Sequence, residues 1–301
     1  MKLIHVGALV LLGAIWGASF LFIREAAHDF GPIALMFVRV LVAGLVLIPI
    51  APMLMKRNSN TPIRLLDHWR EFLIMGAFNS AIPFTLIAFS ELTMTASLAS
   101  ILNSLTPLCT AIVAALWVGE KLTPQKLLGA VLGIVGVGVL VGGSPLALDT
   151  AFLLAVAASI LAAICYGIGT VYASLHIKGI PAIQASIGQL IGASALLALP
   201  TVVSIPDTPP SMRAILSLAA LILLSTSFAY LIYFYLLSNV GATRTASVTF
   251  LVPVFGTIWG ILFLKEPFSA GMLVGMVIIL LSVGLVLGAR FGKAEAVPVS
   301  S

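Results

Sequence analysis

The sequence predicts an all-α polytopic membrane protein, with ten transmembrane helices arranged as two inverted repeats of five. Three observations support this fold class: the composition, a series of ten apolar segments, and an internal duplication. Apolar residues make up 61% of the 301 positions and charged residues only 8%, with a mean hydropathy of +1.20. In soluble domains about a quarter of the residues are charged, so this composition excludes a soluble domain.

The ten apolar segments account for nearly the whole chain. Most approach the ~20 residues that a helix needs to cross a ~30 Å hydrocarbon core. The first follows Lys2 as in a signal peptide, but it continues through Trp16 and Phe20, so we expect a retained span. The longest polar gap, 56–70, leaves no room for an extramembrane catalytic or nucleic-acid-binding domain. We place the spans at 3–23, 32–55, 71–91, 95–118, 125–142, 150–175, 181–205, 213–237, 242–264 and 268–289.

The duplication relates residues 96–142 to residues 242–288 without a gap, at an offset of 146. Pro107 then falls on Pro253, Glu120 on Glu266 and Gly129 on Gly275. Five spans separate equivalent positions, an odd number, so the second copy enters the membrane from the opposite side. Inverted repeats are typical of secondary transporters, with the substrate site at the repeat interface. We therefore expect two domains, 1–145 and 146–301.

The loop charges predict the orientation. With a cytoplasmic N-terminus, eleven cations face the cytoplasm and three, Arg24, Arg213 and Lys265, face outward. This bias follows the positive-inside rule and places both termini in the cytoplasm. The inward-facing cations are Lys2, Lys56, Arg57, Arg64, Arg70, Lys121, Lys126, Lys178, Arg244, Arg290 and Lys293.

Several short motifs recur in the two halves of the chain. The first half carries WGASF at 16–20, Pro32 with Arg39, LTPL at 105–108, GEKLT at 119–123 and glycines 129, 133, 136 and 138. The second half repeats them loosely as LVPV at 251–254, KEPF at 265–268 and glycines 275, 284 and 288. With these motifs the chain resembles the EamA family of the drug/metabolite transporter superfamily. The resemblance implies two fused five-helix halves and a secondary transporter of the bacterial inner membrane that exports small metabolites. An exporter of aromatic or other apolar amino acids is the nearest expectation. Export of drugs, purines or other metabolites is the alternative.

Arg39 is the one charged residue well inside a predicted span. A charge at that depth is costly and normally faces a cavity or a partner. Arg39 either binds a substrate carboxylate or anchors helices to one another. No acidic residue in the spans is an obvious partner, which favours helix carbonyls, Asn103 or an anionic substrate.

Polar and aromatic side chains at mid-span positions complete the predicted substrate cavity. They suit apolar enclosure with a few orienting polar groups, although hydrogen bonding between helices is the alternative for each. Three prolines within spans, Pro83, Pro107 and Pro253, are candidate hinges, because each removes a backbone donor. The other cavity candidates are Trp16, Ser19, Asn79, Asn103, Tyr166, Thr170, Gln189, Tyr230 and Thr249.

The sequence argues against catalysis, metal binding and a cofactor. Its four histidines lie at span ends or in loops, and no His, Asp or Glu cluster lies in the spans. Glu120 and Glu266 end spans on opposite faces, so they cannot share a proton, and we expect them to cap loops or border a gate. A passive channel stays an alternative. The expected partners are a small-molecule substrate and the lipid bilayer, with no nucleic acid.

The glycines of the fifth and tenth spans predict close helix packing. Pairs four residues apart, such as Gly129 with Gly133 and Gly284 with Gly288, let backbones approach. We expect these two spans to pack against each other or against a second subunit. Their glycine and aliphatic composition also places them at the periphery.

Overall fold

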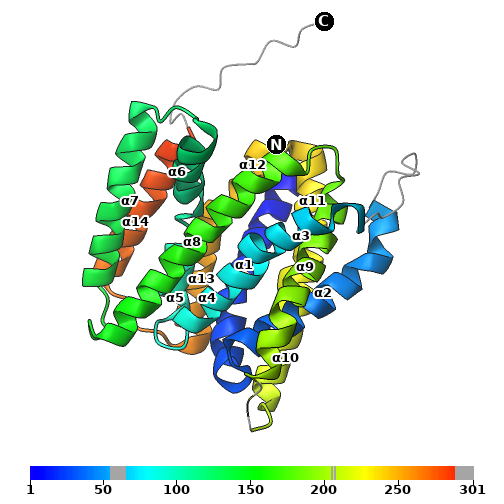
Figure 1. The fold of residues 1–301 in the computed structure, drawn as a ribbon. Coiled ribbons are helices and arrows are strands. Elements are labelled where there is room, and N and C mark those ends of the chain that lie inside the picture. Colours follow the sequence, from blue (N-terminus) through cyan, green and yellow to red (C-terminus); the bar gives the residue numbers. More distant parts are fainter. Residues whose placement is uncertain (55–65, 205, 207, 289–301) are drawn as a thin grey trace, which may run out of the picture.

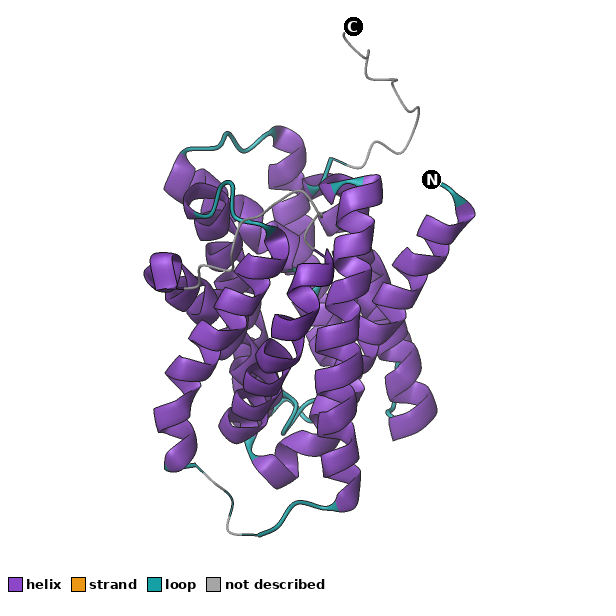
Figure 2. Cartoon of the chain, turned by 90° about the vertical axis from the view of Figure 1, so that its right-hand side faces the viewer, coloured by secondary structure: helices purple, strands orange, loops and turns teal. Residues whose placement is uncertain are grey.

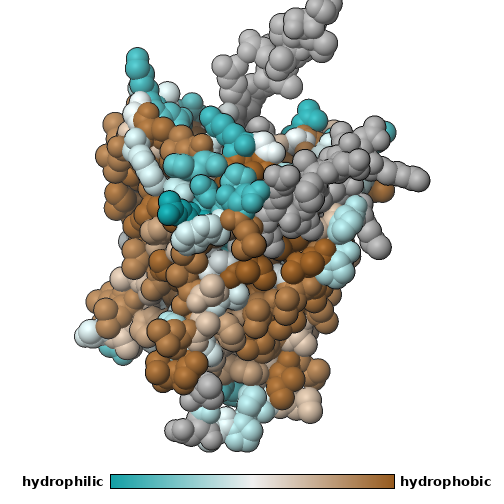
Figure 3. Space-filling model, turned by 45° about the vertical axis from the view of Figure 1, so that its right-hand side comes forward, coloured by the Kyte–Doolittle hydropathy of each residue, from teal (hydrophilic) through white to brown (hydrophobic). Residues whose placement is uncertain are grey.

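A computed structural model describes residues 1–54, 66–204, 206 and 208–288, and these residues form an all-helical bundle (Figures 1 and 2). Eight helical segments are long and apolar enough to cross a membrane, and two shorter apolar helices follow, as expected of a polytopic membrane protein. On the face shown in Figure 3, hydrophobic residues form a broad band, with hydrophilic residues toward the top and the bottom. The ends of three predicted spans, at 55, 205 and 289, lie outside the described residues, as do Lys56, Arg57, Arg64, Arg290 and Lys293.

The first half contains five of these membrane segments. They are built from α1 (Leu3–Phe30), α2 (Pro32–Leu54), η1 (Leu66–His68), α3 (Trp69–Gly76), η2 (Ala77–Ala81), α4 (Ile82–Ser90), α5 (Ala96–Asn103), α6 (Thr106–Val118) and α7 (Pro124–Gly142). The second half contains α8 (Thr150–His176), α9 (Ala182–Val202), α10 (Met212–Ile222), η3 (Leu223–Phe228), α11 (Ala229–Val240), α12 (Ala242–Thr245), α13 (Val248–Leu264) and α14 (Ala270–Val286).

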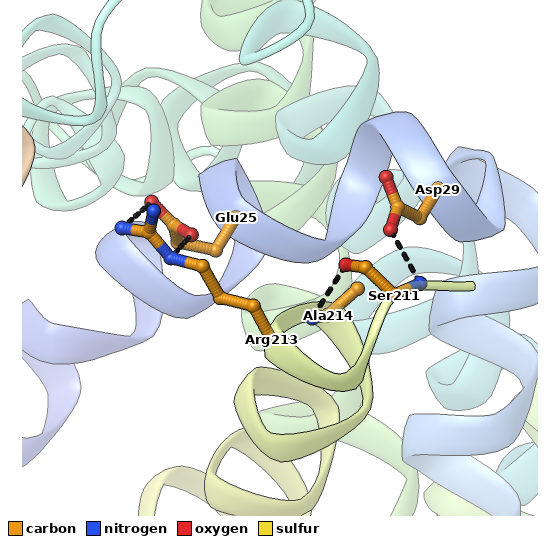
Figure 4. Close-up of polar contacts among 5 residues, drawn as sticks. All are labelled: Glu25, Asp29, Ser211, Arg213 and Ala214. Atoms are coloured by element: carbon orange, nitrogen blue, oxygen red, sulfur yellow. Dashed lines mark hydrogen bonds and ion pairs between the residues drawn. The ribbon is translucent and has the colours of Figure 1, made fainter.

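Helix α1 is longer than the predicted span, which ended at residue 23. Its additional turns carry polar residues that hydropathy does not count as membrane-spanning. They are held by α10: Arg213 forms a bidentate ion pair with Glu25, and the Ser211 N–H donates to Asp29 Oδ2 at 2.8 Å (Figure 4). The helix therefore ends at Phe30, where Gly31 adopts a left-handed φ of 70°.

Four predicted spans are interrupted rather than continuous. The third and eighth each contain a π-helical turn, η2 and η3, and these turns start at residues 77 and 223, which the 146-residue offset relates. The fourth span breaks between α5 and α6, and the ninth between α12 and α13. Pro107 therefore lies at the start of α6, whereas Pro253 lies inside α13.

Helices α7 and α14 pack side by side at one edge of the bundle (Figure 1). The prediction that the fifth and tenth spans contact each other is thus confirmed. Ser282 Oγ donates to the Gly129 carbonyl at 2.6 Å. A Cβ on Gly143 would lie 2.7 Å from Gly271 Cα, so the end of α7 meets the start of α14. The two helices therefore run antiparallel.

The ends of the helices form two faces of the bundle. The terminal face carries the start of α1 and the loop 119–123, both at the top of Figure 1. The opposite face carries the loops 143–149 and 265–269, which touch where Ser269 Oγ donates to the Gly143 carbonyl.

Candidate functional site

Arg39 is buried in the first half of α2, with 6% of its surface exposed. Its Nε donates to Thr226 Oγ1 at 3.1 Å, and its Nη1 lies 3.8 Å from Met36 Sδ. The guanidinium carbon sits 4.0 Å from the centroid of the Phe84 ring, a cation–π contact. The expected partners were helix carbonyls, Asn103 or a substrate. Within the protein the hydroxyl of Thr226 takes that place.

Aromatic and amide side chains surround this arginine. The Tyr166 and Tyr230 hydroxyl groups lie within electrostatic range of the guanidinium, as does the Glu91 carboxylate, which forms no ion pair with it. The Tyr166 ring packs edge-on against Phe84, with centroids 6.3 Å apart. Gln189 Nε2 donates to the Tyr230 hydroxyl at 3.2 Å. We call this group the Arg39 cluster: Arg39, Phe84, Tyr166, Gln189, Thr226 and Tyr230.

The π-helical turns shape the cluster from both halves. Thr226 lies in η3, where its hydroxyl also donates to the Leu221 carbonyl at 2.9 Å. Asn79 lies at the equivalent turn, η2, and packs on α8 so closely that a Cβ on Gly169 would be 2.3 Å from its Oδ1. Such turns are rare and often mark functional sites. Their matching positions point to a site shared between the halves.

Asn103 lies where α5 ends, and its side-chain Oδ1 is buried without a hydrogen-bond partner. Because proline has no backbone N–H, Pro107 cannot donate a hydrogen bond to the Asn103 carbonyl. Thr106 Oγ1 donates to this carbonyl instead, at 2.8 Å. In the second half, Pro253 stands in the same relation to Thr249, whose hydroxyl donates to the Ala246 carbonyl at 2.8 Å. Two of the three predicted hinges, Pro107 and Pro253, therefore sit beside predicted cavity residues.

The remaining candidates lie on neighbouring elements. Trp16 is half-buried and packs against Tyr233, with ring centroids 5.7 Å apart, and Ser19 is 7% exposed on the same helix. Thr170 is exposed on α8. It lies two and a half turns after the exposed Leu161, so the two side chains are on opposite sides of the helix. Among the described residues, no hydrogen bond or ring contact joins Trp16, Asn103 or Thr249 directly to the Arg39 cluster.

Two members of the cluster, Phe84 and Thr226, were not predicted. The repeat offset carried a signal for Phe84, because it is the counterpart of Tyr230. Thr226 carries no comparable signal, since nothing in the sequence marks the π-helical turn. Glu91 was also missed. It follows α4 on the opposite face, is 0% exposed, and its backbone carbonyl accepts from Arg24.

The arrangement can recognise a planar anion. A guanidinium has five N–H donors in a fixed fork, and the described contacts use only part of them. No described carboxylate forms an ion pair with Arg39. Its charge is therefore available to a ligand, and the surrounding rings offer an apolar enclosure.

Comparison with known proteins agrees with this architecture. The model of the EamA-like transporter family matches residues 4–142 and again residues 153–288. The chain belongs to the EamA-like transporter family. The names of the family and of the relatives indicate a membrane transporter rather than an enzyme.

The relatives are distant but match nearly end to end. The transporter YoaV of Bacillus subtilis (strain 168) is 23% identical over 267 residues, covering 88% of this chain and 90% of that protein. Protein PecM of Dickeya dadantii (strain 3937) is 26% identical and covers 88% and 86%. The inner membrane transporter YedA of Escherichia coli (strain K12) is 25% identical and covers 84% and 81%. A solved crystal structure, 19% identical, superposes with a TM-score of 0.63 over 92% of this chain and 95% of that one, which supports the fold.

Proposed function

We propose that this chain is a secondary transporter of the bacterial inner membrane that exports amino acids with aromatic or other apolar side chains. The observation that carries the proposal is the Arg39 cluster: a buried cation that forms no ion pair with any carboxylate of the described residues, set among aromatic rings. A substrate that supplies a carboxylate to the guanidinium and an apolar side chain to the rings satisfies both parts.

The proposed binding mode uses both halves. The substrate carboxylate pairs with Arg39, and its side chain lies among Tyr166, Tyr230 and Trp16. The unpartnered Oδ1 of Asn103 accepts a hydrogen bond from the substrate ammonium. The elements carrying these groups, α1, α2, α5, α8 and α11, come from both repeats.

The proposed mechanism is alternating access by two inverted repeats, residues 1–145 and 146–301. The antiparallel packing of α7 and α14 and the matched π-helical turns support it. The loop charges favour cytoplasmic termini, and the relative YedA, which is named an inner membrane transporter, supports the location.

Uptake into proteoliposomes tests the proposal. Labelled phenylalanine and leucine are offered with and without a pH gradient, and a purine base and a cationic drug are tested as competitors. Saturable uptake that excess unlabelled phenylalanine suppresses is the expected result, and its dependence on the gradient defines the coupling. Uptake suppressed only by the purine or the drug would refute the amino-acid proposal, and flux that never saturates would indicate a channel.

A further inference from the structure

One carboxylate joins the two repeats on the opposite face. Glu266 Oε1 accepts from the Ala96 N–H at 2.7 Å, and Oε2 accepts from the N–H and hydroxyl of Ser97 at 3.0 and 2.6 Å. These N–H groups open α5 and lack partners in their own helix, where a negative charge is favourable. We call this contact the latch. It ties the second repeat, beyond the end of α13, to the start of α5 in the first.

Two glycines of α13 let it reach α5 beneath the latch. A Cβ on Gly260 would lie 2.3 Å from Glu266 Oε2 and 2.5 Å from Ser97 Oγ. A Cβ on Gly256 would lie 2.5 Å from Ser100 Oγ. Residues 96–102 of α5 are all buried. The bundle is therefore closed here.

Glu120 is the repeat counterpart of Glu266 on the terminal face. The local backbone is the same at both positions: Gly119 and Lys265 have left-handed φ angles of 71° and 55°. The Glu120 N–H donates to the Ala114 carbonyl, as the Glu266 N–H donates to that of Gly260. The side chains nevertheless differ, because Glu120 is 54% exposed and pairs with Lys126 within its own repeat.

The segment that Glu120 would latch is also uncovered. Ala242 is exposed, whereas its counterpart Ala96 is 0% exposed, and Arg244 beside it is exposed as well. Helix α13 packs against α5, but among the described residues no comparable packing joins α6 to α12. Equivalent elements are thus docked on the opposite face and separated on the terminal face.

We propose that Glu120 and Glu266 are alternating latches of the two gates, an inference that rests on the proposed alternating access. When the terminal face closes, Glu120 leaves Lys126 and accepts from the N–H groups of residues 242 and 243, while Glu266 releases α5. A pocket of about 450 Å³ lies on the solvent side of the closed latch, lined by Arg24, His28, Thr95 and Lys265 among others. It is where the substrate leaves when this gate opens.

The sequence also biases the exchange. At an offset of 146, Lys126 corresponds to Met272, so a lysine competes for Glu120 but none stands at the equivalent position beside Glu266. Ala114 replaces Gly260, so the terminal gate packs less closely. The state with the opposite face closed is therefore the more stable one.

Distances between spin labels on the full-length chain test the latches. Cys109 and Cys165 are first replaced by alanine. Labels at Thr93 and Pro267 report the opposite gate, and labels at Val118 and Arg244 report the terminal gate; all four positions are exposed. Electron spin resonance measures the distance between the two labels of each pair, and these distances give the population of each state.

Glu266→Gln should raise the population with the opposite gate open about tenfold, the effect of losing one hydrogen bond to a charged group. Ser97→Ala, which removes a donor from the other side, should shift it in the same direction. Lys126→Met should also favour closure of the terminal gate. Adding Glu120→Gln should cancel this effect of Lys126→Met, but it should not cancel the effect of Glu266→Gln.

Asp149→Asn is the matched control. Asp149 also caps a helix on this face, since its Oδ1 accepts from the Phe152 N–H at 2.8 Å, but it caps its own helix and crosses no gate. The Asp149→Asn variant should populate the two gate states as the parent protein does. If both gates exchange but Glu266→Gln and Ser97→Ala leave the populations unchanged, the latches are refuted and alternating access is not. A single fixed distance at both gates, with and without phenylalanine, would overturn alternating access as well.

Discussion

Replacing Arg39 by glutamine should weaken phenylalanine binding by about ten- to a hundredfold. Arg39 is 6% exposed and forms no ion pair with a described carboxylate, so a bound carboxylate would meet its guanidinium largely shielded from water. A hydrogen bond to a charged group contributes about 1.5–3 kcal/mol, and each 1.4 kcal/mol is tenfold in affinity. The substitution also removes the cation–π contact with Phe84, which should lower the free energy of unfolding by about 1–2 kcal/mol.

Calorimetric titration of the purified protein with phenylalanine and with phenylalaninamide measures this effect. The amide lacks the carboxylate, so the parent protein should prefer phenylalanine and Arg39→Gln should bind both ligands equally. Thr226→Val, which removes the hydroxyl that fixes Arg39 Nε, should reduce the preference by a smaller factor. If Arg39→Gln weakens both ligands by the same factor, Arg39 anchors helices and does not bind the carboxylate.

Three further predictions concern the hinges and the close contacts. Pro107→Ala and Pro253→Ala should each slow turnover while leaving the Kd for phenylalanine within about twofold, because the restored backbone donor stiffens the break; unchanged turnover would disprove the hinge. Gly260→Ala places a methyl group 2.3 Å from the latch carboxylate, so it should lower Tm and open the opposite gate, an overpacking cost of about 1–3 kcal/mol. A Tm and gate distance equal to the parent's would contradict this. Gly169→Ala should displace the Asn79 amide and raise the Kd, and an unchanged Kd would place Asn79 outside the site.

Much of the fold could be predicted because a lipid environment forces backbone groups to pair within helices. Apolar segments long enough to cross therefore had to be helical. Helix ends were less predictable. The last turns of α1 depend on Glu25 and Asp29 meeting α10, which no hydropathy window records.

The candidate site was predictable in part. A charge as costly as Arg39 is visible in any apolar segment, and the 146-residue offset related Tyr230 to Phe84. The π-helical turns were not predictable, because a shift from an i→i−4 to an i→i−5 hydrogen bond depends on packing across helices. The position of Thr226 beside Arg39 follows from such a turn.

Glu266 was expected to cap a loop or border a gate. Its actual acceptor role depends on how closely the two repeats approach on one face. A contact between residues 170 positions apart leaves no local pattern in the chain.

Counterflow of labelled phenylalanine tests the central claim most directly. Proteoliposomes loaded with excess unlabelled phenylalanine are diluted into a trace of the labelled form, with no ion gradient. A carrier that exposes one site alternately to each side accumulates the label transiently above its equilibrium level, and Arg39→Gln should abolish this overshoot. Label that only equilibrates, at the same rate with or without internal phenylalanine, would contradict the account.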